Sequence, residues 1–184
     1  MGDAGIPATR RHMHRHPDSD TPQELNWNLW LEEHGPLLYN YARQLYAAEA
    51  EDIMQRALIQ TAKAVREGRL PARGDDALRY ACTVIRHEAY GSTRRSRQRS
   101  TALQEWAVQA PLLTAPDPAA EERCAAAEAA LRELDTDYAE VIMLHLWGGL
   151  TFREIAAITG ETGDAVSSRY RYALILLRKK LQYS

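Results

Sequence analysis

Apolar residues recur at intervals of three and four along two separate blocks of this chain, and that spacing restricts it to a helical fold. In the first block Leu37, Leu38, Tyr41 and Leu45 fall on one face of a helix. A single Phe and an abundance of Ala, Leu, Arg and Glu favour helix over strand nearly everywhere. We therefore expect an all-α protein built from two small helical domains.

Prolines and glycines set the expected domain limits. Pro111, Pro116 and Pro118 fall in a stretch with little periodicity, which is typical of a linker. The first residues contain Gly and Pro without an apolar period, which predicts a flexible arm. We expect an arm over residues 1–20, a first domain over 21–100, a flexible linker over 101–120 and a second domain over 121–184.

Breakers and capping residues also predict where helices begin and end. In the first domain, Gly35-Pro36 should divide the initial helical stretch into two packed helices, and Asp75 or Asp76 can cap a later helix. In the second domain, Asp135 can cap the helix that ends at Gly148-Gly149. Residues 151–154 then form a capping box, and residues 160–163 form the turn before a final helix.

Charge is segregated along the chain although the formal net charge is only -2. Residues 84–100 carry a net +4, residues 117–140 a net -6 and residues 166–184 a net +5. Solvated helix faces can produce one basic block, but two basic blocks favour contact with nucleic-acid phosphates. The short helix, glycine turn and following helix over residues 151–172 fit a helix-turn-helix, whose second helix would present Ser167, Ser168, Arg169 and Arg171 to DNA bases.

Several function classes are disfavoured by the same sequence. Cys82 and Cys124 have no CxxC neighbour, so we expect neither a disulfide framework nor a cysteine zinc site. No apolar stretch is long enough to span a bilayer, and the start lacks a signal-peptide core, so we expect a cytoplasmic protein without membrane insertion. No catalytic motif stands out, so we expect no enzyme, no catalytic residues, no cofactor and no metal.

Residues 131–181 resemble region 4 of the extracytoplasmic-function sigma factors of the sigma-70 family. Glu154-Ile155-Ala156 and Val166-Ser167-Ser168-Arg169 lie in register with the two helices of that pattern. Upstream, residues 50–64 resemble the region 2 helix that binds the polymerase clamp, and residues 80–99 resemble the helix that melts the minus-10 element. The resemblance implies a promoter-recognising sigma factor whose partners are core RNA polymerase and promoter DNA, with an anti-sigma factor as a further partner.

The resemblance also implies three groups of binding residues. The polymerase-binding group is Asp52, Gln55 and Arg56. The minus-10 group is Tyr80, His87, Tyr90, Arg94, Arg95, Arg97 and Arg99. The minus-35 group is Thr151, Arg153, Ser167, Ser168, Arg169, Arg171 and Tyr172. The aromatic and imidazole rings of the minus-10 group would stack on an extruded base, and its arginines would bind phosphates.

Five positions depart from the family pattern. Arg56 stands where an acid is usual, Tyr80 where Trp is common, His87 where Asn is frequent, Gly91 where Asp is frequent, and Tyr172 where Arg is frequent. These departures leave a second hypothesis open, a helix-turn-helix regulator that binds DNA without core polymerase. A third hypothesis, a metal-dependent enzyme, would use His12, His14 and His16 of the arm.

Overall fold

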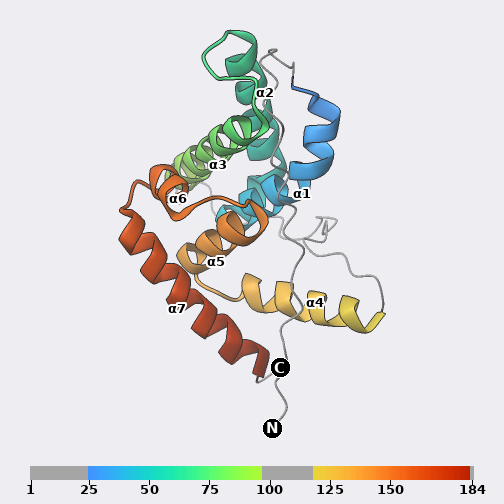
Figure 1. Cartoon of the computed structure of the whole chain (residues 1–184), viewed down its shortest axis with the longest axis vertical. Coiled ribbons are helices and arrows are strands. Elements are labelled where there is room, and N and C mark those ends of the chain that lie inside the picture. Colours follow the sequence, from blue (N-terminus) through green and yellow to red (C-terminus); the bar gives the residue numbers. More distant parts are fainter. Residues whose placement is uncertain (1–24, 97–117, 183–184) are drawn as a thin grey trace.

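The computed structural model describes residues 25–96 and 118–182, and both parts are helical (Figure 1). The elements in chain order are α1 (Trp27–Leu45), η1 (Ala47–Glu49), α2 (Ala50–Arg66), α3 (Gly74–Ser96), α4 (Pro118–Arg132), α5 (Thr136–Ile142), the π-helical turn η2 (Met143–Trp147), α6 (Phe152–Thr159) and α7 (Gly163–Gln182). The described residues contain no strand, and the all-α prediction is confirmed.

The helices form an N-terminal group, α1 to α3, and a C-terminal group, α4 to α7. In the N-terminal group the apolar faces of the helices meet at Leu38, Ile53 and Ile85, all fully buried. The indole Nε1 of Trp30 also donates to the Gly74 carbonyl oxygen at 3.1 Å, which ties α1 to the start of α3. The linker and arm predicted over 101–120 and 1–20 lie almost entirely outside the described residues.

The predicted break at Gly35-Pro36 is wrong, because α1 continues through both residues. Proline removes one backbone donor from a helix, and its ring crowds the preceding turn. Here the face beyond the proline is held by burial of Leu37, Leu38 and Tyr41, and the side chain of Asn40 donates to the Pro36 carbonyl oxygen at 2.9 Å. Tertiary packing therefore outweighs the local helix-breaking signal.

In the C-terminal group, the helices begin and end closer to the positions that the capping residues and glycines predict. The Thr151 hydroxyl accepts from the Glu154 amide, and the Glu154 carboxylate accepts from the Thr151 amide, so the capping box is confirmed. Gly160 ends α6 in the left-handed conformation, with φ of 76°, which favours glycine. Asp135 stands at the N-cap of α5 without a side-chain capping bond, and α5 passes into the π-helical turn η2 before Gly148. In the N-terminal group, Asp75 and Asp76 lie within the first turn of α3 rather than before it.

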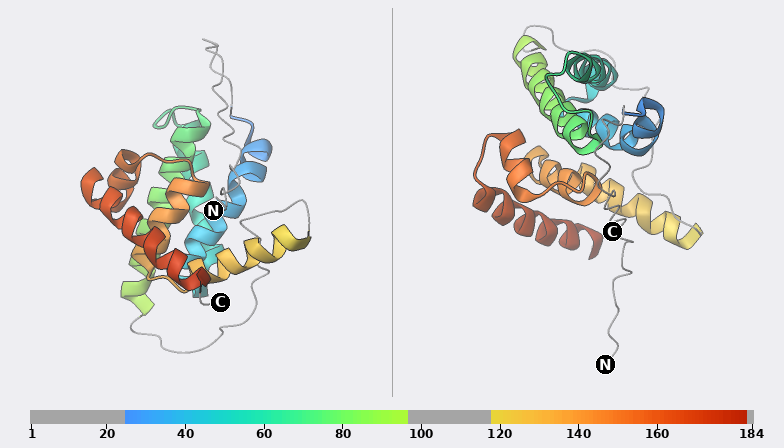
Figure 2. Two further views of the ribbon diagram at one scale, coloured as in Figure 1. Left: turned by 60° about the horizontal axis from the view of Figure 1, so that its bottom comes forward. Right: turned by 45° about the horizontal axis from the view of Figure 1, so that its top comes forward.

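The two groups lie against each other, as the right-hand view of Figure 2 shows. Buried apolar side chains form one continuous cluster that runs from Trp30 in α1 to Ala173 in α7. Helices α1 and α3 of the first group contact α5 and α6 of the second. The helices with the predicted minus-10 and minus-35 residues, α3 and α7, are thus parts of one packed body.

Candidate polymerase and nucleic-acid interfaces

The predicted polymerase-binding residues lie on α2, where the structure separates Arg56 from the other two. Asp52 and Gln55 are exposed. Arg56 is instead paired with two acids, because its guanidinium lies 3.0 Å from a Glu88 carboxylate oxygen on α3 and 3.8 Å from a Glu49 oxygen. The cation that departs from the family pattern therefore finds its counter-charges within the chain.

Reversing the charge of Arg56 should destabilise the N-terminal group. In Arg56→Glu a carboxylate would face Glu49 and Glu88, and we expect the free energy of unfolding to fall by about 0.5–1 kcal/mol, since these partners are partly solvated. Urea denaturation measures this change. The double variant Arg56→Glu/Glu88→Arg restores an opposite-charge pair and should recover most of the loss; no recovery would rule out a direct interaction.

The predicted minus-10 residues on α3 differ in exposure. Tyr80 is half-buried against the apolar cluster, whereas His87 and Tyr90 are exposed. Arg86 lies over the Tyr90 ring, with its guanidinium carbon 4.7 Å from the ring centroid. An open surface depression of about 390 Å³ is lined by Thr83, Arg86, His87, Tyr90, Gly91 and, from α6, Ile158. The rings proposed to stack on a base thus open onto the space between α3 and α6.

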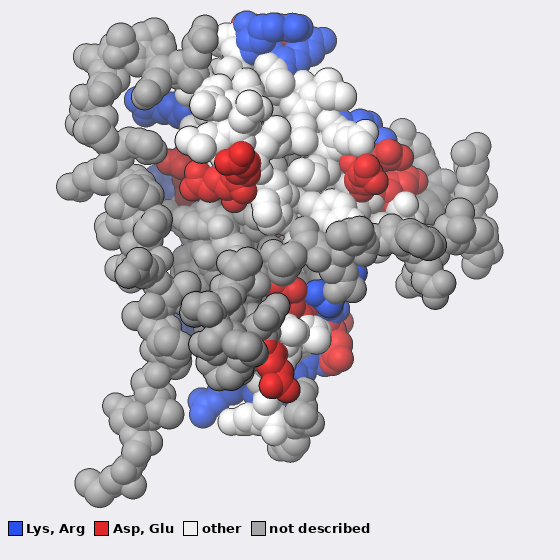
Figure 3. Space-filling view, turned by 90° about the vertical axis from the view of Figure 1, so that its right-hand side faces the viewer, with Lys and Arg blue, Asp and Glu red and all other residues white. Residues whose placement is uncertain are grey.

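The basic end of the minus-10 group is only partly described. Arg94 and Arg95 fall in the last turns of α3, and Arg97 and Arg99 lie outside the described residues. The face shown in Figure 3 carries Lys, Arg, Asp and Glu in small groups with uncharged surface between them. This face is the right-hand side of Figure 1, where α1 and α4 lie, and the described residues form no continuous basic surface on it.

A buried carboxylate joins the two helical groups. Glu140 of α5 is fully buried, and its Oε1 accepts hydrogen bonds from the Tyr41 hydroxyl of α1 at 2.6 Å and from Arg86 Nε of α3 at 2.9 Å. Its other oxygen, Oε2, is also buried and has no hydrogen-bond partner among the described residues. Only one of the two Glu140 oxygens is therefore hydrogen-bonded, although both lie buried where the two helical groups meet.

The same carboxylate alters the titration of its neighbours. Burial and the Glu140 charge raise the pKa of the Tyr41 hydroxyl well above its usual value. Burial lowers the pKa of Arg86, but the charge and hydrogen bond of Glu140 outweigh it, so that the pKa is raised overall. Burial and then the Glu140 charge raise the pKa of the Cys82 thiol to about 12. Tyr41 and Cys82 are thus held protonated at neutral pH.

Cys82 should consequently react slowly in the folded chain. Because thiolates are the reactive form, we expect alkylation by iodoacetamide near pH 8 to be at least about tenfold slower in the folded chain than in urea. A Cys124→Ser background isolates the signal of Cys82, and equal rates in the two states would contradict the prediction. The raised pKa also means that stability from the protonated thiol is present below about pH 8.5 and is lost as the pH rises toward 12.

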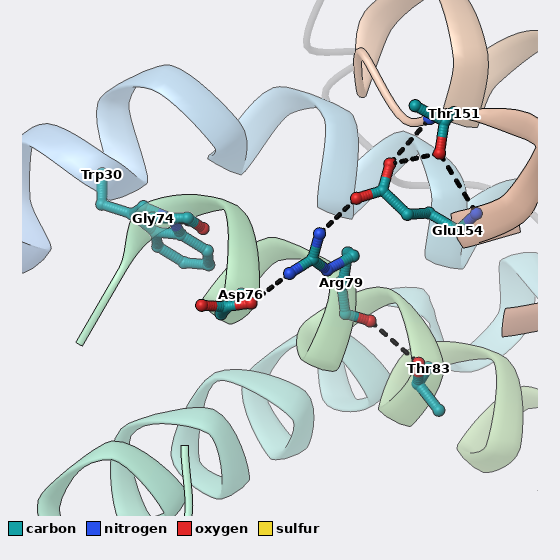
Figure 4. A network of polar contacts seen from close by, with 7 residues as sticks. All are labelled: Trp30, Gly74, Asp76, Arg79, Thr83, Thr151 and Glu154. Atoms are coloured by element: carbon teal, nitrogen blue, oxygen red, sulfur yellow. Dashed lines mark hydrogen bonds and ion pairs between the residues drawn. The ribbon is translucent and has the colours of Figure 1, made fainter. Parts of the chain in front are cut away.

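A second ionic contact joins α3 to α6. Arg79 of α3 reaches Asp76 in its own helix with one guanidinium nitrogen and Glu154 of α6 with another (Figure 4). Glu154 at the same time holds the capping box with Thr151, and these contacts lower its pKa against the opposing effect of burial. The ion pair between Arg79 and Glu154 thereby joins the start of the helix-turn-helix to the N-terminal group.

The predicted minus-35 residues are not equivalent in the structure. Thr151 is exposed but serves as the cap of α6, and Arg153 is exposed. On α7, Arg169 is held by Glu161 at 2.7 Å, whereas Arg171 is exposed, with only long contacts of 3.4 Å to the Ser167 carbonyl oxygen and the Ser168 hydroxyl. Ser168 and Tyr172 are exposed and Ser167 is half-buried. Arg153 and Arg171 are therefore the arginines of this set that are most available to a ligand.

Sequence reasoning missed the residues that connect the two groups. Arg86 was counted only as part of a basic block, and Arg79, Glu140 and Glu154 were not assigned to any surface. One signal was present, since Glu140 is an acid inside the apolar run that contains Val141 and Ile142. Its partners could not be identified because Tyr41 and Arg86 lie 99 and 54 residues away in the chain.

Among residues 25–96 and 118–182, no cluster of His, Cys, Asp and Glu suited to a metal ion is found. His12, His14 and His16 lie outside that part of the chain. No helix that the structure describes combines the length and apolarity needed to cross a bilayer.

Comparison with known proteins identifies the family. The family model for sigma-70 region 2 matches residues 30–99, and the model for sigma-70 region 4 matches residues 124–177. The fold is similar to that of the sigma factor RpoE from Bartonella quintana, crystallised with the anti-sigma factor NepR, with 24% identity, a TM-score of 0.62 and coverage of 85% of this chain and 96% of that one. No curated protein is a significant sequence match.

The chain belongs to the sigma-70 family of RNA polymerase sigma factors. It is a sigma factor, which binds core RNA polymerase and promoter DNA and directs transcription initiation.

Proposed function

We propose that this sigma factor divides promoter recognition between α3 and α7. Residues 21–100 would act as region 2, which docks on core polymerase through Asp52 and Gln55 of α2 and holds the minus-10 strand on α3. Residues 121–184 would act as region 4, which reads the minus-35 element with α7 and is joined to region 2 by residues 101–120. Two family matches in the expected order, each on its own set of helices, are the observation that carries this assignment.

The predicted minus-10 residues divide into two roles. The exposed rings of His87 and Tyr90 offer surfaces on which an extruded base can stack. Arg94, Arg95, Arg97 and Arg99 would bind phosphates near the edge of the duplex. On α7, Ser168 and Arg171 would reach base edges in the major groove, with Ser167 and Tyr172 beside them. The protein would contribute binding energy rather than catalysis, with no cofactor of its own.

An anti-sigma factor is a further proposed partner, supported by the complex in which the similar RpoE was crystallised. Such a partner would act by covering the faces of α2, α3 or α7 that polymerase and DNA use.

The decisive experiment is a pull-down of the full chain with bacterial core RNA polymerase, followed by run-off transcription on fragmented genomic DNA. Binding together with discrete new start sites is the expected result, and it would deliver the promoter sequence. A folded chain that binds DNA but not core polymerase would favour the helix-turn-helix regulator instead.

A further inference from the structure

An open depression of about 450 Å³ lies between α1 and the beginning of the C-terminal group. We call it the α1–α4 depression, because Arg43 and Gln44 of α1 face Leu131 and Arg132 of α4 across it. The described residues that line it include none from α2, α3, α6 or α7. Small-molecule sites commonly have volumes of roughly 300–1,000 Å³. The depression is therefore large enough for a small ligand and separate from the helices proposed to bind polymerase and DNA.

Arg43 is the lining residue whose charge is least compensated. The residue is half-buried, and its Nη1 is buried without a hydrogen-bond partner in the described structure. The described residues also supply no carboxylate within ion-pair distance of it, whereas Arg132 lies 3.0 Å from a Glu128 oxygen. Shielding a charged group from water without a partner costs free energy. An anion bound to Arg43 would offset part of that cost.

We propose that the α1–α4 depression is a binding site for a small organic carboxylate. The guanidinium of Arg43 would bind the carboxylate, which can accept two parallel hydrogen bonds from it. Because Arg43 is only half-buried, a rotation of its long side chain would turn the buried nitrogen toward the depression. Leu131, Leu134 and Met143 line the same space and supply an apolar wall for the body of the ligand.

The charges around the depression favour a carboxylate over a phosphate. Glu128 and Asp135 line the same space as Arg43. A phosphate dianion would face both of these acids, whereas a carboxylate brings a single charge on an apolar body. The Gln44 amide and the Thr136 hydroxyl, on half-buried residues, add neutral donors that carry no such preference for a second charge. The ligand that fits best is therefore singly charged and partly apolar.

Benzoate and its neutral isostere benzamide test the site in the full chain. Titration followed by NMR of carbon-labelled methyl groups should show that benzoate shifts the signals of Leu134 and Met143. Benzamide should bind at least about tenfold more weakly, since it lacks the charge that strengthens the hydrogen bonds to Arg43. Inorganic phosphate, titrated in the same way, should also bind more weakly than benzoate.

Substitutions of Arg43 then show whether this residue binds the carboxylate. Arg43→Gln should weaken benzoate binding by about tenfold or more and leave benzamide binding unchanged. Arg43→Lys keeps the charge but not the paired donors, and we expect a loss of about two- to fivefold. Arg66→Gln is the matched control, because it removes an exposed arginine of α2 that does not line the depression. It should bind benzoate as tightly as the wild type.

The stability of Arg43→Gln is measured in the same series. Because Nη1 of Arg43 has no partner in the described structure, its loss should leave the unfolding temperature unchanged or raise it. A loss of benzoate binding by this variant would then not result from misfolding. If the variant nevertheless fails to fold, Arg43→Lys and the comparison of benzoate with benzamide in the wild type decide the matter.

Each possible result bears on the site alone, since these measurements use neither polymerase nor promoter DNA. Benzoate binding that depends on Arg43 and is kept in Arg66→Gln supports the proposal. It is overturned by the absence of methyl shifts with benzoate, by equal affinity for benzoate and benzamide, by phosphate binding as tight as that of benzoate, or by equal losses in Arg43→Gln and Arg66→Gln. Failure of the proposed function would appear instead in the pull-down and run-off transcription.

Discussion

Ile155→Ala is expected to lower the free energy of unfolding by about 2–5 kcal/mol, a large part of the roughly 5–15 kcal/mol that stabilises an ordinary domain. Ile155 lies on α6 with no exposed surface and belongs to the continuous apolar cluster. Helix α6 has only eight residues, too few to be stable alone, so its position depends on this burial. Urea denaturation followed by circular dichroism measures the change.

Ile175→Ala on α7 is the matched control. It removes the same atoms from a side chain that is 52% exposed, and we expect a change within about 0.5 kcal/mol. Since α6 carries the capping box and the turn that orient α7, Ile155→Ala should also weaken binding to the minus-35 element. Equal destabilisation by the two variants would show that α6 is not held by the apolar cluster as the structure describes.

The sequence predicted the helices best where the local signal and the tertiary structure agree. Residues 151–163 contain a capping box and a glycine in the left-handed conformation, and each fixes the backbone within a few residues. Pro36 shows the opposite case, in which burial of the neighbouring apolar face overrides the local preference. The end of α5 likewise differs, because the chain widens into a π-helical turn that periodicity cannot reveal.

The sequence predicted which residue types would form the candidate sites, but not which of these side chains are free to bind a partner. The sequence placed Arg56, Arg169 and Arg171 among the binding residues without distinguishing them. The structure pairs Arg56 with Glu88 and Arg169 with Glu161, and it leaves Arg171 exposed. The first pair depends on how α2 meets α3, and the second on the turn before α7, and charge counts along a chain contain neither.

Arg171→Ala is expected to weaken binding to the promoter by about 1–3 kcal/mol, which is roughly five- to 150-fold. Arg171 is exposed on α7, and its hydrogen bonds within the described chain are two long ones to Ser167 and Ser168, so little is lost when it turns to DNA. Binding of the holoenzyme to the promoter found by run-off transcription, measured at several salt concentrations, tests this.

Two further variants serve as controls for Arg171→Ala. Arg178→Ala removes the same charge from an exposed site two turns along α7 and should reduce affinity less. Arg169→Ala should act mainly on stability, because it breaks the ion pair to Glu161 at the turn between α6 and α7. If Arg171 binds a phosphate, its loss lowers affinity on all sequences and reduces the salt slope by about one; if it binds a base, its loss relaxes specificity at one position. Unchanged affinity in Arg171→Ala would remove this arginine from the recognition surface and leave Thr151, Arg153, Ser168 and Tyr172 as its exposed candidates.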